Sequence, residues 1–311
     1  MTNTNNNNMT FKKLCQLFCC PPWPGSITAK LAFMPPPPSY DFRRIESTED
    51  RYAMVLKDGA HWIHSQSDLQ KLEGFFVRTR RGNKIACLYV KCTSKPRFIV
   101  LFSHGNAVDL GLCSGYYIWL GTNLKCDILS YDYSGYGISG GSPYESNLYL
   151  DIAAVWRTLK LRYNASPENI ILYGYSIGTV PTIRLAAKER VAGVVIHSGL
   201  MSGLRVAFPH MTTTLCCDPF PSVERVRKIR SPTLVIHGTD DEIIDFSHGL
   251  GLHDRCPAAV EPLWVDGGGH NDLEFRTVFL ERLKRFLSDE VDRSAAAPSG
   301  DDFRLIFCCK V

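Results

Sequence analysis

The chain has 311 residues, 45% of them hydrophobic, and no long polar break divides its middle two thirds, so we expect one large folded domain. Its net charge of +4 is a mild bias without a concentrated stripe of Lys and Arg, and we expect no nucleic-acid partner. Because no run of about 18 apolar residues occurs, we also expect no membrane-spanning helix.

The placement of the twelve cysteines argues against metal binding and disulfides. Five lie near the chain ends, seven are scattered, and none forms a C-x-x-C pair, so we expect no structural metal site and no cofactor. A disulfide framework is typical of small secreted domains, and this chain is too large to need one. We therefore expect a reduced, intracellular protein.

Composition divides the chain into three parts. Residues 1–39 hold an Asn- and Thr-rich start, a cysteine-rich segment and a Pro-rich spacer, and we expect a disordered region with a membrane-targeting segment. Residues 40–288 form the predicted folded domain. Residues 289–311 form a predicted tail that is mostly disordered.

The segment from Phe11 to Cys20 mixes apolar residues, two lysines and three cysteines. Its apolar side chains can enter a lipid interface while the lysines meet anionic lipid. Cys15, Cys19 and Cys20 are therefore candidates for S-acylation, and two long acyl chains already hold a protein firmly on a membrane. The last four residues superficially offer a prenylation box at Cys308, but Lys310 stands where an aliphatic residue is expected, so S-acylation of the pair Cys308-Cys309 is preferred, as a weaker candidate than the N-terminal cysteines.

The folded part begins with short strands that pair around turn residues and continues with strands that alternate with helices. That alternation predicts the α/β class, with a mostly parallel central sheet and helices on both faces. We predict two hairpins, 51–56 with 61–66 and 75–80 with 85–92. The later strands are predicted at 98–102, 127–131, 170–173, 191–196, 233–236 and 262–265, and the helices at 116–124, 144–162, 177–188 and 271–287.

The run from Gly174 to Gly178 reads Gly-Tyr-Ser-Ile-Gly and lies between a predicted strand and a predicted helix. That context is the one a nucleophile elbow requires, because the turn is too sharp for side chains at the two glycine positions. It would expose the hydroxyl of Ser176 at a helix N-terminus, where the helix dipole favours negative charge. We predict Ser176 as a nucleophile within an α/β-hydrolase fold; a capping serine is the alternative.

A serine nucleophile needs a base, and in this fold the base is a histidine near the end of the chain. His270 follows the last short strand and three glycines, which let a loop carry the imidazole back over the sheet. We expect other roles for the remaining histidines. They are structural His104 and His237, core His197, surface His210, His248 and His253, and His61 and His64 ahead of the parallel sheet.

The acid that orients the base should follow a strand between Ser176 and His270. Three carboxylates crowd the turn after the strand at 233–236. Asp241 occupies the acid position of the common H-G-x-x-D pattern, so Asp240 and Glu242 should face solvent. Asp245 remains an outside candidate, and the alternative for the whole turn is a helix cap.

An oxyanion hole needs two N–H donors aimed at the developing negative charge. We predict the backbone N–H groups of Ile177, which follows the nucleophile, and Asn106, with Ala107 as the alternate to Asn106. Asp132 also follows a parallel strand, and we expect it to brace the backbone.

The chain between the strands at 191–196 and 233–236 should form a small lid, which would leave Ser176 accessible to a bulky acylated substrate. Apolar residues of that stretch are candidates to line an acyl groove, although core packing explains them equally well. They are Leu200, Met201, Leu204, Val206 and Phe208.

Long runs of this sequence resemble one family. Leu17–Pro22, Leu101–Gly111, Ser130–Gly137, Ser176–Pro181 and Ser202–Pro209 carry the resemblance, together with Ile244–Gly249. These runs are similar to the alpha/beta-hydrolase domain-containing protein 17 family of membrane-bound protein depalmitoylases. The resemblance extends from about Cys15 to Leu287. This sequence departs from the family at Tyr175, where glutamine is usual, and in its Asn-rich start and C-terminal tail.

The resemblance implies a palmitoyl-protein thioesterase that acts on S-acylated substrates such as Ras-type GTPases and scaffold proteins. It implies a triad at Ser176, Asp241 and His270. It also implies a palmitoylated N-terminus and a lipid-anchored location on the cytoplasmic face of the plasma membrane and endosomal membranes. The alternatives are a carboxylesterase acting on lipids or small esters, and a membrane-tethered binding module with a vestigial triad.

Overall fold

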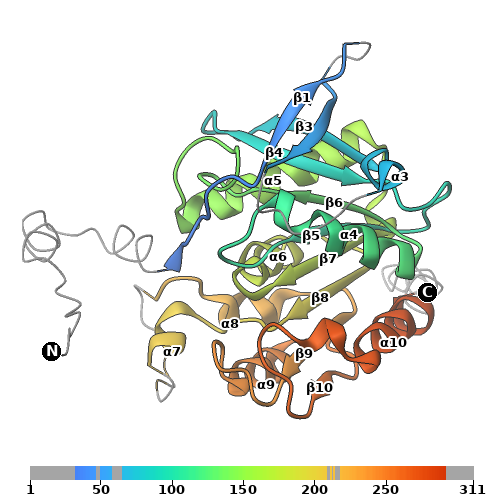
Figure 1. Ribbon diagram of the computed structural model, residues 1–311. Helices are drawn as coiled ribbons and strands as arrows, with labels where there is room; N and C mark the ends of the chain where they lie inside the picture. The colour runs from blue at the N-terminus through green and yellow to red at the C-terminus, as the bar shows by residue number, and fades with distance from the viewer. Residues whose placement is uncertain are drawn as a thin grey trace, which may run out of the picture.

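The computed structural model describes residues 32–46, 50–57, 65–208, 211, 213 and 218–291. Within these residues, ten strands form one sheet in the order β1-β2-β3-β4-β6-β5-β7-β8-β9-β10 (Figure 1). The strands from β5 to β10 are parallel, and β1 to β4 form an antiparallel extension. This arrangement confirms the predicted fold class. The strands are β1 (Tyr40–Arg44), β2 (Tyr52–Leu56), β3 (Leu72–Arg78), β4 (Lys84–Val90), β5 (Ile99–Ser103), β6 (Asp127–Tyr131), β7 (Ile170–Tyr175), β8 (Gly193–His197), β9 (Thr233–Gly238) and β10 (Leu263–Val265).

Helices cover both faces of the sheet, because successive residues of its buried strands point to opposite sides. In β5, Ile99 and Leu101 join the core under α5 and α6, whereas Val100 and Phe102 join the core under α4 and α10. Figure 1 shows β5 and β7 at the centre of the molecule. The helices are α3 (Gln66–Leu69), α4 (Leu110–Leu124), α5 (Glu145–Arg162), α6 (Thr179–Ala186), α7 (Gly203–Ala207), α8 (Ser222–Arg225), α9 (Phe246–Arg255) and α10 (Thr277–Arg285), with the short turns η1 (Pro167–Asn169), η2 (Ser176–Gly178), η3 (Val226–Lys228), η4 (Leu273–Phe275) and η5 (Phe286–Val291).

The predicted parallel strands all occur, and the early hairpins differ from expectation. The second predicted hairpin is the antiparallel pair of β3 and β4. For the first, β2 pairs with β1 and β3, and Gln66 begins helix α3 behind the capping residue Ser65. Residues 58–64 lie outside the described residues. The β-strand propensity of the sequence did not show that β2 pairs with β1 and β3.

The packed chain is longer at both ends than the predicted domain. Phe33 is 5% exposed, and its ring meets Tyr136 and Phe220 edge to face, although residues 1–39 are predicted to lie outside the folded domain. Val291, beyond the predicted end at residue 288, is also buried. The cysteine candidates Cys15, Cys19, Cys20, Cys308 and Cys309 lie outside the described residues. In the part of the chain that is described, no helix is both long and apolar enough to cross a membrane.

Candidate active site

Ser176 is the first residue of η2, in a strained turn directly after β7. Its φ angle is 53°, in the left-handed region that residues other than glycine rarely adopt. A Cβ atom at Gly178 would lie 2.0 Å from the carbonyl oxygen of Ser103, and one at Gly174 would lie 2.6 Å from that of Gly178. Only glycine fits at these two positions, and their close approach packs the elbow against the end of β5. Strain of this kind is held where the surrounding fold fixes it, and it is common at functional sites.

The structure brings the three predicted residues together. His270 Nε2 lies 3.0 Å from Ser176 Oγ, and His270 Nδ1 lies 2.8 Å from Asp241 Oδ2. All three side chains are at most 8% exposed. These are hydrogen-bond distances, and the order hydroxyl, imidazole, carboxylate is the one that allows a proton to pass from Ser176 to His270.

The Asp241 carboxylate is held in place by more than His270. Its Oδ1 accepts hydrogen bonds from the N–H groups of Ile243 and Ile244, at 3.0 and 2.8 Å. Its Oδ2 also lies 3.2 Å from Nε2 of the buried His237. Burial opposes ionisation of Asp241, but the hydrogen bonds from His237, His270 and Ile244 outweigh it and hold its pKa well below the ordinary value. Asp241 is therefore ionised beside the imidazole.

The neighbouring acids have other positions. Asp240 and Glu242 are exposed, and Glu242 accepts a hydrogen bond from the N–H of His270 at 3.2 Å. Asp245, the outside candidate for the acid, caps α9 by accepting from the N–H of Ser247. Of the four carboxylates, only Asp241 contacts the ring of His270 in the described structure.

The loop after β5 carries the predicted oxyanion donor Asn106. This loop lies against the elbow, since a Cβ at Gly105 would be 3.9 Å from Ser176 Cβ. Ala107, the alternate donor, has a φ of 55°, and its N–H is directed to Oδ1 of Asn106 at 3.1 Å. Asn106 belongs to the loop after β5, and Ile177 belongs to the elbow that this loop contacts. The donor role of their N–H groups stays a prediction.

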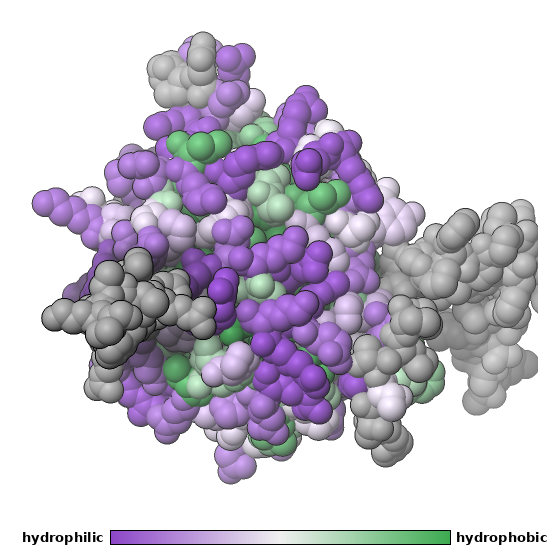
Figure 2. All heavy atoms as spheres, turned by 180° about the vertical axis from the view of Figure 1, so that it is seen from behind, coloured by the Kyte–Doolittle hydropathy of each residue, from purple (hydrophilic) through white to green (hydrophobic). Residues whose placement is uncertain are grey.

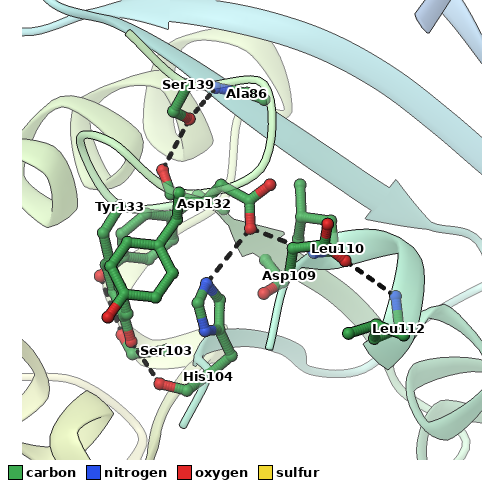
Figure 3. A network of polar contacts seen from close by, with 12 residues as sticks. Ala86, Ser103, His104, Asp109, Leu110, Leu112, Asp132, Tyr133 and Ser139 are labelled. Carbon is green, nitrogen blue, oxygen red and sulfur yellow. Dashed lines mark hydrogen bonds and ion pairs between the residues drawn. The ribbon is translucent and has the colours of Figure 1, made fainter. Parts of the chain in front are cut away.

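A buried polar network around His104 and Asp132 supports the loop after β5 (Figure 3). His104 Nε2 lies 3.3 Å from Asp132 Oδ1, and both side chains are fully buried. Asp132 also accepts hydrogen bonds from the N–H of Leu110 at 3.0 Å and the hydroxyl of Tyr40 at 2.6 Å. Burial raises the pKa of Asp132, and the contact with His104 opposes that rise. Asp132 therefore braces the first turn of α4 and the ring of His104.

The side chain of Asn106 binds the segment that precedes β1 to the same loop. We call residues 32–39 the strap. Asn106 Nδ2 donates to the carbonyl oxygen of Ala32 at 2.8 Å, and Asn106 Oδ1 accepts from the N–H of Met34 at 3.1 Å. At the other end of the strap, the N–H of Ser39 donates to Asp109 at 2.7 Å. The sequence held no signal for these contacts, because they join residues about 70 positions apart.

The remaining histidines differ in their burial. His197 is 2% exposed, as a core histidine should be. His248 is also 2% exposed and accepts from the N–H of Met201 at 2.9 Å, so its predicted surface position is wrong. The reason is that α9 turns this side chain inward against the chain after β8. His61, His64 and His210 lie outside the described residues. No group of three or more His, Cys, Asp or Glu residues in the described chain could hold a metal ion.

The candidates for an acyl groove lie between β8 and α8. Leu200 is buried, and Met201 and Val206 pack against the core under α5 and α6. Phe208 is exposed. Core packing accounts for the first three. An acyl groove lined by these residues stays a prediction.

Comparison with known proteins identifies relatives of this chain. A family model described as alpha/beta hydrolase family matches residues 100–215. Alpha/beta hydrolase domain-containing protein 17C of Xenopus tropicalis is 52% identical over 302 residues, which cover 93% of this chain and 97% of that protein. Alpha/beta hydrolase domain-containing protein 17B of Homo sapiens is 54% identical over 285 residues, covering 92% and 99%.

Solved structures share the fold at low sequence identity. An esterase of Pyrococcus furiosus superposes with a TM-score of 0.57 at 18% identity, over 73% of this chain and 95% of that one. An esterase of a Rhodococcus species gives 0.51 at 20% identity, over 70% and 98%. Identity over nearly the whole length carries more weight than fold likeness. The chain belongs to the alpha/beta hydrolase domain-containing protein 17 family and is a hydrolase of the α/β-hydrolase fold.

Proposed function

We propose that this protein is a serine thioesterase that removes palmitate from S-acylated cysteines of membrane-associated proteins. The observation that carries the proposal is the contact series of Ser176, His270 and Asp241 at the end of β7. We assign Ser176 as the nucleophile, His270 as the general base and Asp241 as the carboxylate that orients His270. The family resemblance supports the choice of a thioester substrate.

In the first half of the reaction, Ser176 Oγ attacks the thioester carbonyl carbon while its proton passes to His270 Nε2. The carbonyl oxygen becomes negative and accepts hydrogen bonds from the N–H groups of Asn106 and Ile177. The C–S bond then breaks, and His270 returns the proton to the leaving cysteine thiolate. The products of this half are a free cysteine and a palmitoyl ester on Ser176.

In the second half, water attacks the ester carbon while His270 takes its proton. The ester C–O bond breaks, Ser176 Oγ recovers the proton, and palmitate leaves. Asp241 stays ionised throughout and stabilises the imidazolium that forms twice per cycle. Its lowered pKa and its hydrogen bonds from Ile243 and Ile244 suit that role.

The strap supports a membrane-associated substrate. It leads from the cysteine-rich segment directly to Asn106, beside Ser176. Ala32 follows Cys20 by twelve positions, and an extended chain of that length spans at most about 40 Å. If Cys15, Cys19 and Cys20 are acylated, Ser176 cannot lie far from the bilayer. Acylated cysteines of neighbouring membrane proteins would then be within reach.

On the face seen in Figure 2, the coloured surface offers no broad apolar area for membrane attachment. Figure 2 shows hydrophilic side chains over most of its coloured surface, with hydrophobic ones in small separate areas. Small, scattered apolar areas are ordinary for a protein surface in water. We therefore propose a lipid-anchored peripheral protein of the cytoplasmic face of the plasma membrane and endosomal membranes.

The test of the function uses purified full-length protein and a Ras-type GTPase carrying a radiolabelled palmitoyl thioester. We expect release of palmitate by the wild type and at least a 10³-fold lower rate for Ser176→Ala. Ser198→Ala, which removes a buried hydroxyl from the end of the next strand, is the matched control and should keep most of the rate. Release that survives Ser176→Ala would refute the assignment.

Two further measurements separate the alternatives. A fluorophosphonate probe should label the wild type and not Ser176→Ala, and absence of labelling would favour a binding module. Thioester and oxyester substrates of equal chain length should differ in kcat/KM in favour of the thioester. A preference for the oxyester would make the protein a carboxylesterase.

A further inference from the structure

A cavity of about 520 Å³ lies on the α4 side of the sheet, between α4 and η4. Its volume is in the range of small-molecule sites. Most of its wall is apolar and includes Phe102, Leu112, Tyr116 and Trp119. Phe275, which is 81% exposed, lines it too, so the cavity reaches the surface beside η4.

This cavity lies beside the site at Ser176, and Gly105, Tyr175 and Asn271 contribute to its lining. None of Ser176, Asp241 and His270 lines it. The wall between them is Tyr175, whose ring stacks on that of His270 with centroids 5.5 Å apart. The Tyr175 hydroxyl donates to the carbonyl oxygen of His270 at 3.0 Å and to Asn271 Oδ1 at 2.6 Å. On the other side, Gly105 packs so closely that a Cβ there would lie 2.8 Å from the Tyr175 ring.

The lining also holds polar side chains, among them His104, Asn271, His197 and Glu274. His197 and Glu274 both line the cavity, and neither His197 Nε2 nor Glu274 Oε2 has a hydrogen-bond partner among the described residues, although both atoms are buried. The His197 side chain is 2% exposed and its Nδ1 lies 2.9 Å from the Tyr173 hydroxyl. Buried polar atoms are almost always hydrogen-bonded, so two unpaired atoms around one cavity point to a ligand with a polar group.

The protonation of these groups narrows the chemistry of that ligand. Burial lowers the pKa of His197 to about 3, so the imidazole is neutral at pH 7. When its Nδ1–H donates to Tyr173, Nε2 is a hydrogen-bond acceptor. Burial, with the charge of Asp272, raises the pKa of Glu274. A hydrocarbon would leave both groups unpaired, whereas a hydroxyl donates to either group and accepts from a protonated one.

We propose that this cavity is a second ligand site, which binds a lipid with an unbranched apolar chain and a hydroxyl head group. The chain lies along Phe102, Tyr116 and Trp119, and the hydroxyl donates to His197 or Glu274. Long-chain alcohols and monoacylglycerols share this chemistry. The proposal goes beyond the thioesterase reaction and does not depend on it, because binding can be measured in the Ser176→Ala protein.

The experiment compares two probes of equal chain length, 1-decanol and methyl decyl ether, by equilibrium dialysis against full-length Ser176→Ala protein. The ether accepts hydrogen bonds and cannot donate one. We expect saturable binding of 1-decanol about tenfold tighter than that of the ether, the effect of one hydrogen bond to a buried acceptor. Glu274→Leu combined with His197→Phe should remove this preference while binding of the ether persists. Glu274→Leu alone, at a partly exposed position, is the second variant in case the double variant does not fold. It should reduce the preference for 1-decanol.

A space-filling variant tests the location. Leu112→Trp should abolish binding of both probes, and Leu161→Trp, at an exposed position of α5 on the other face of the sheet, should leave both affinities unchanged. Circular dichroism and thermal unfolding establish that each variant is folded. Equal affinity for alcohol and ether in the parent protein would overturn the proposal, and so would binding that persists in folded Leu112→Trp. Binding of the Ser176→Ala protein to phosphatidylcholine vesicles is then compared with and without monoacylglycerol in the vesicles. Tighter binding to the vesicles that contain monoacylglycerol would identify a membrane lipid as the source of the ligand, and equal binding would identify a free alcohol.

Discussion

At Asp241, one carboxylate contacts two histidines and two backbone N–H groups. His270 and His237 approach the same oxygen, at 2.8 and 3.2 Å, while Ile243 and Ile244 donate to the other. A carboxylate with this many donors cannot rotate freely, so it holds the imidazole of His270 in one orientation and one tautomer. His237, which the sequence reads as structural, thereby acts on the site through Asp241.

The Asp241→Asn variant tests this residue. The amide keeps the shape but loses the charge that stabilises the imidazolium, so we expect kcat to fall by about 10³- to 10⁴-fold with little change in KM. The measurement is steady-state hydrolysis of a thioester substrate. Asp240→Asn, one position away and exposed, is the matched control and should remain within about twofold of the wild type, as for an ordinary surface position. Equal losses in both variants would contradict the assignment of Asp241.

Gly178→Ala tests the packing of the elbow. The added methyl would lie 2.0 Å from the carbonyl oxygen of Ser103, so either β5 or the elbow must move. We expect a loss of about 1–3 kcal/mol in the free energy of unfolding together with a large loss of kcat. Urea denaturation and hydrolysis rates measure the two effects. Gly140→Ala, where the nearest atom would be 3.6 Å away, should be close to the wild type in both.

At the scale of elements, the strap and the loop after β5 form one unit. The strap contributes no strand to the sheet, yet Phe33 enters the core and Asn106 binds both Ala32 and Met34. The N–H proposed to bind the oxyanion belongs to Asn106 itself. Displacement of the strap should therefore change the position of that donor relative to Ser176.

Met34→Pro tests the strap. Proline lacks the N–H that donates to Asn106 Oδ1 and to the Tyr136 hydroxyl, and it suits the extended chain before Pro35. We expect kcat to fall by about threefold to tenfold, with a loss of about 1 kcal/mol in the free energy of unfolding. Met34→Ala keeps the N–H and removes only a side chain that is 59% exposed, so it should match the wild type. A Met34→Pro protein with wild-type kcat would separate the strap from the site.

The junction of α5 with the loop after β6 predicts a pH dependence of stability. Asp151 on α5 is buried and accepts from the N–H and hydroxyl of Ser134, at 2.7 and 2.8 Å, and burial raises its pKa to about 7. Between about pH 4 and 7 the unfolded chain has released this proton and the folded chain still holds it. Stability from this group is therefore present below pH 4 and lost as the pH rises to 7.

Asp151→Asn removes that titration and should flatten the profile of unfolding free energy between pH 4 and 7. Urea denaturation at each pH measures it. Asp266→Asn, at an exposed position after β10, should keep the slope of the wild type. An unchanged slope in Asp151→Asn would mean that another group titrates in this window.

At the scale of the whole molecule, the proposed function needs a catalytic site and a membrane attachment on one chain. Replacement of Cys15, Cys19 and Cys20 by Ser should move the protein from the membrane pellet to the supernatant after cell fractionation, because the acyl chains supply the binding energy. Hydrolysis of a small ester in solution should be unchanged, since none of these cysteines belongs to the proposed triad. Unchanged pelleting would assign the attachment to Cys308 and Cys309 or to protein partners.

The sequence by itself determined the parts of this protein that depend on local pattern. Apolar runs and their spacing located every strand from β5 to β10, and the elbow and the H-G-x-x-D pattern selected Ser176 and Asp241. These features are readable because a buried parallel strand needs a continuous apolar run, and a sharp turn needs glycine.

Only the tertiary structure decided which distant groups meet. The inward position of His248, the strap on Asn106 and the cavity behind Tyr175 each join segments far apart in the chain. The pairing of β2 with β1 and the contact of His237 with Asp241 join nearby segments, and the sequence pattern did not show that they meet. Such contacts depend on how helices and loops pack over the sheet. Hydrophobic periodicity indicates which face of an element is buried, but it does not indicate which other residues that face contacts.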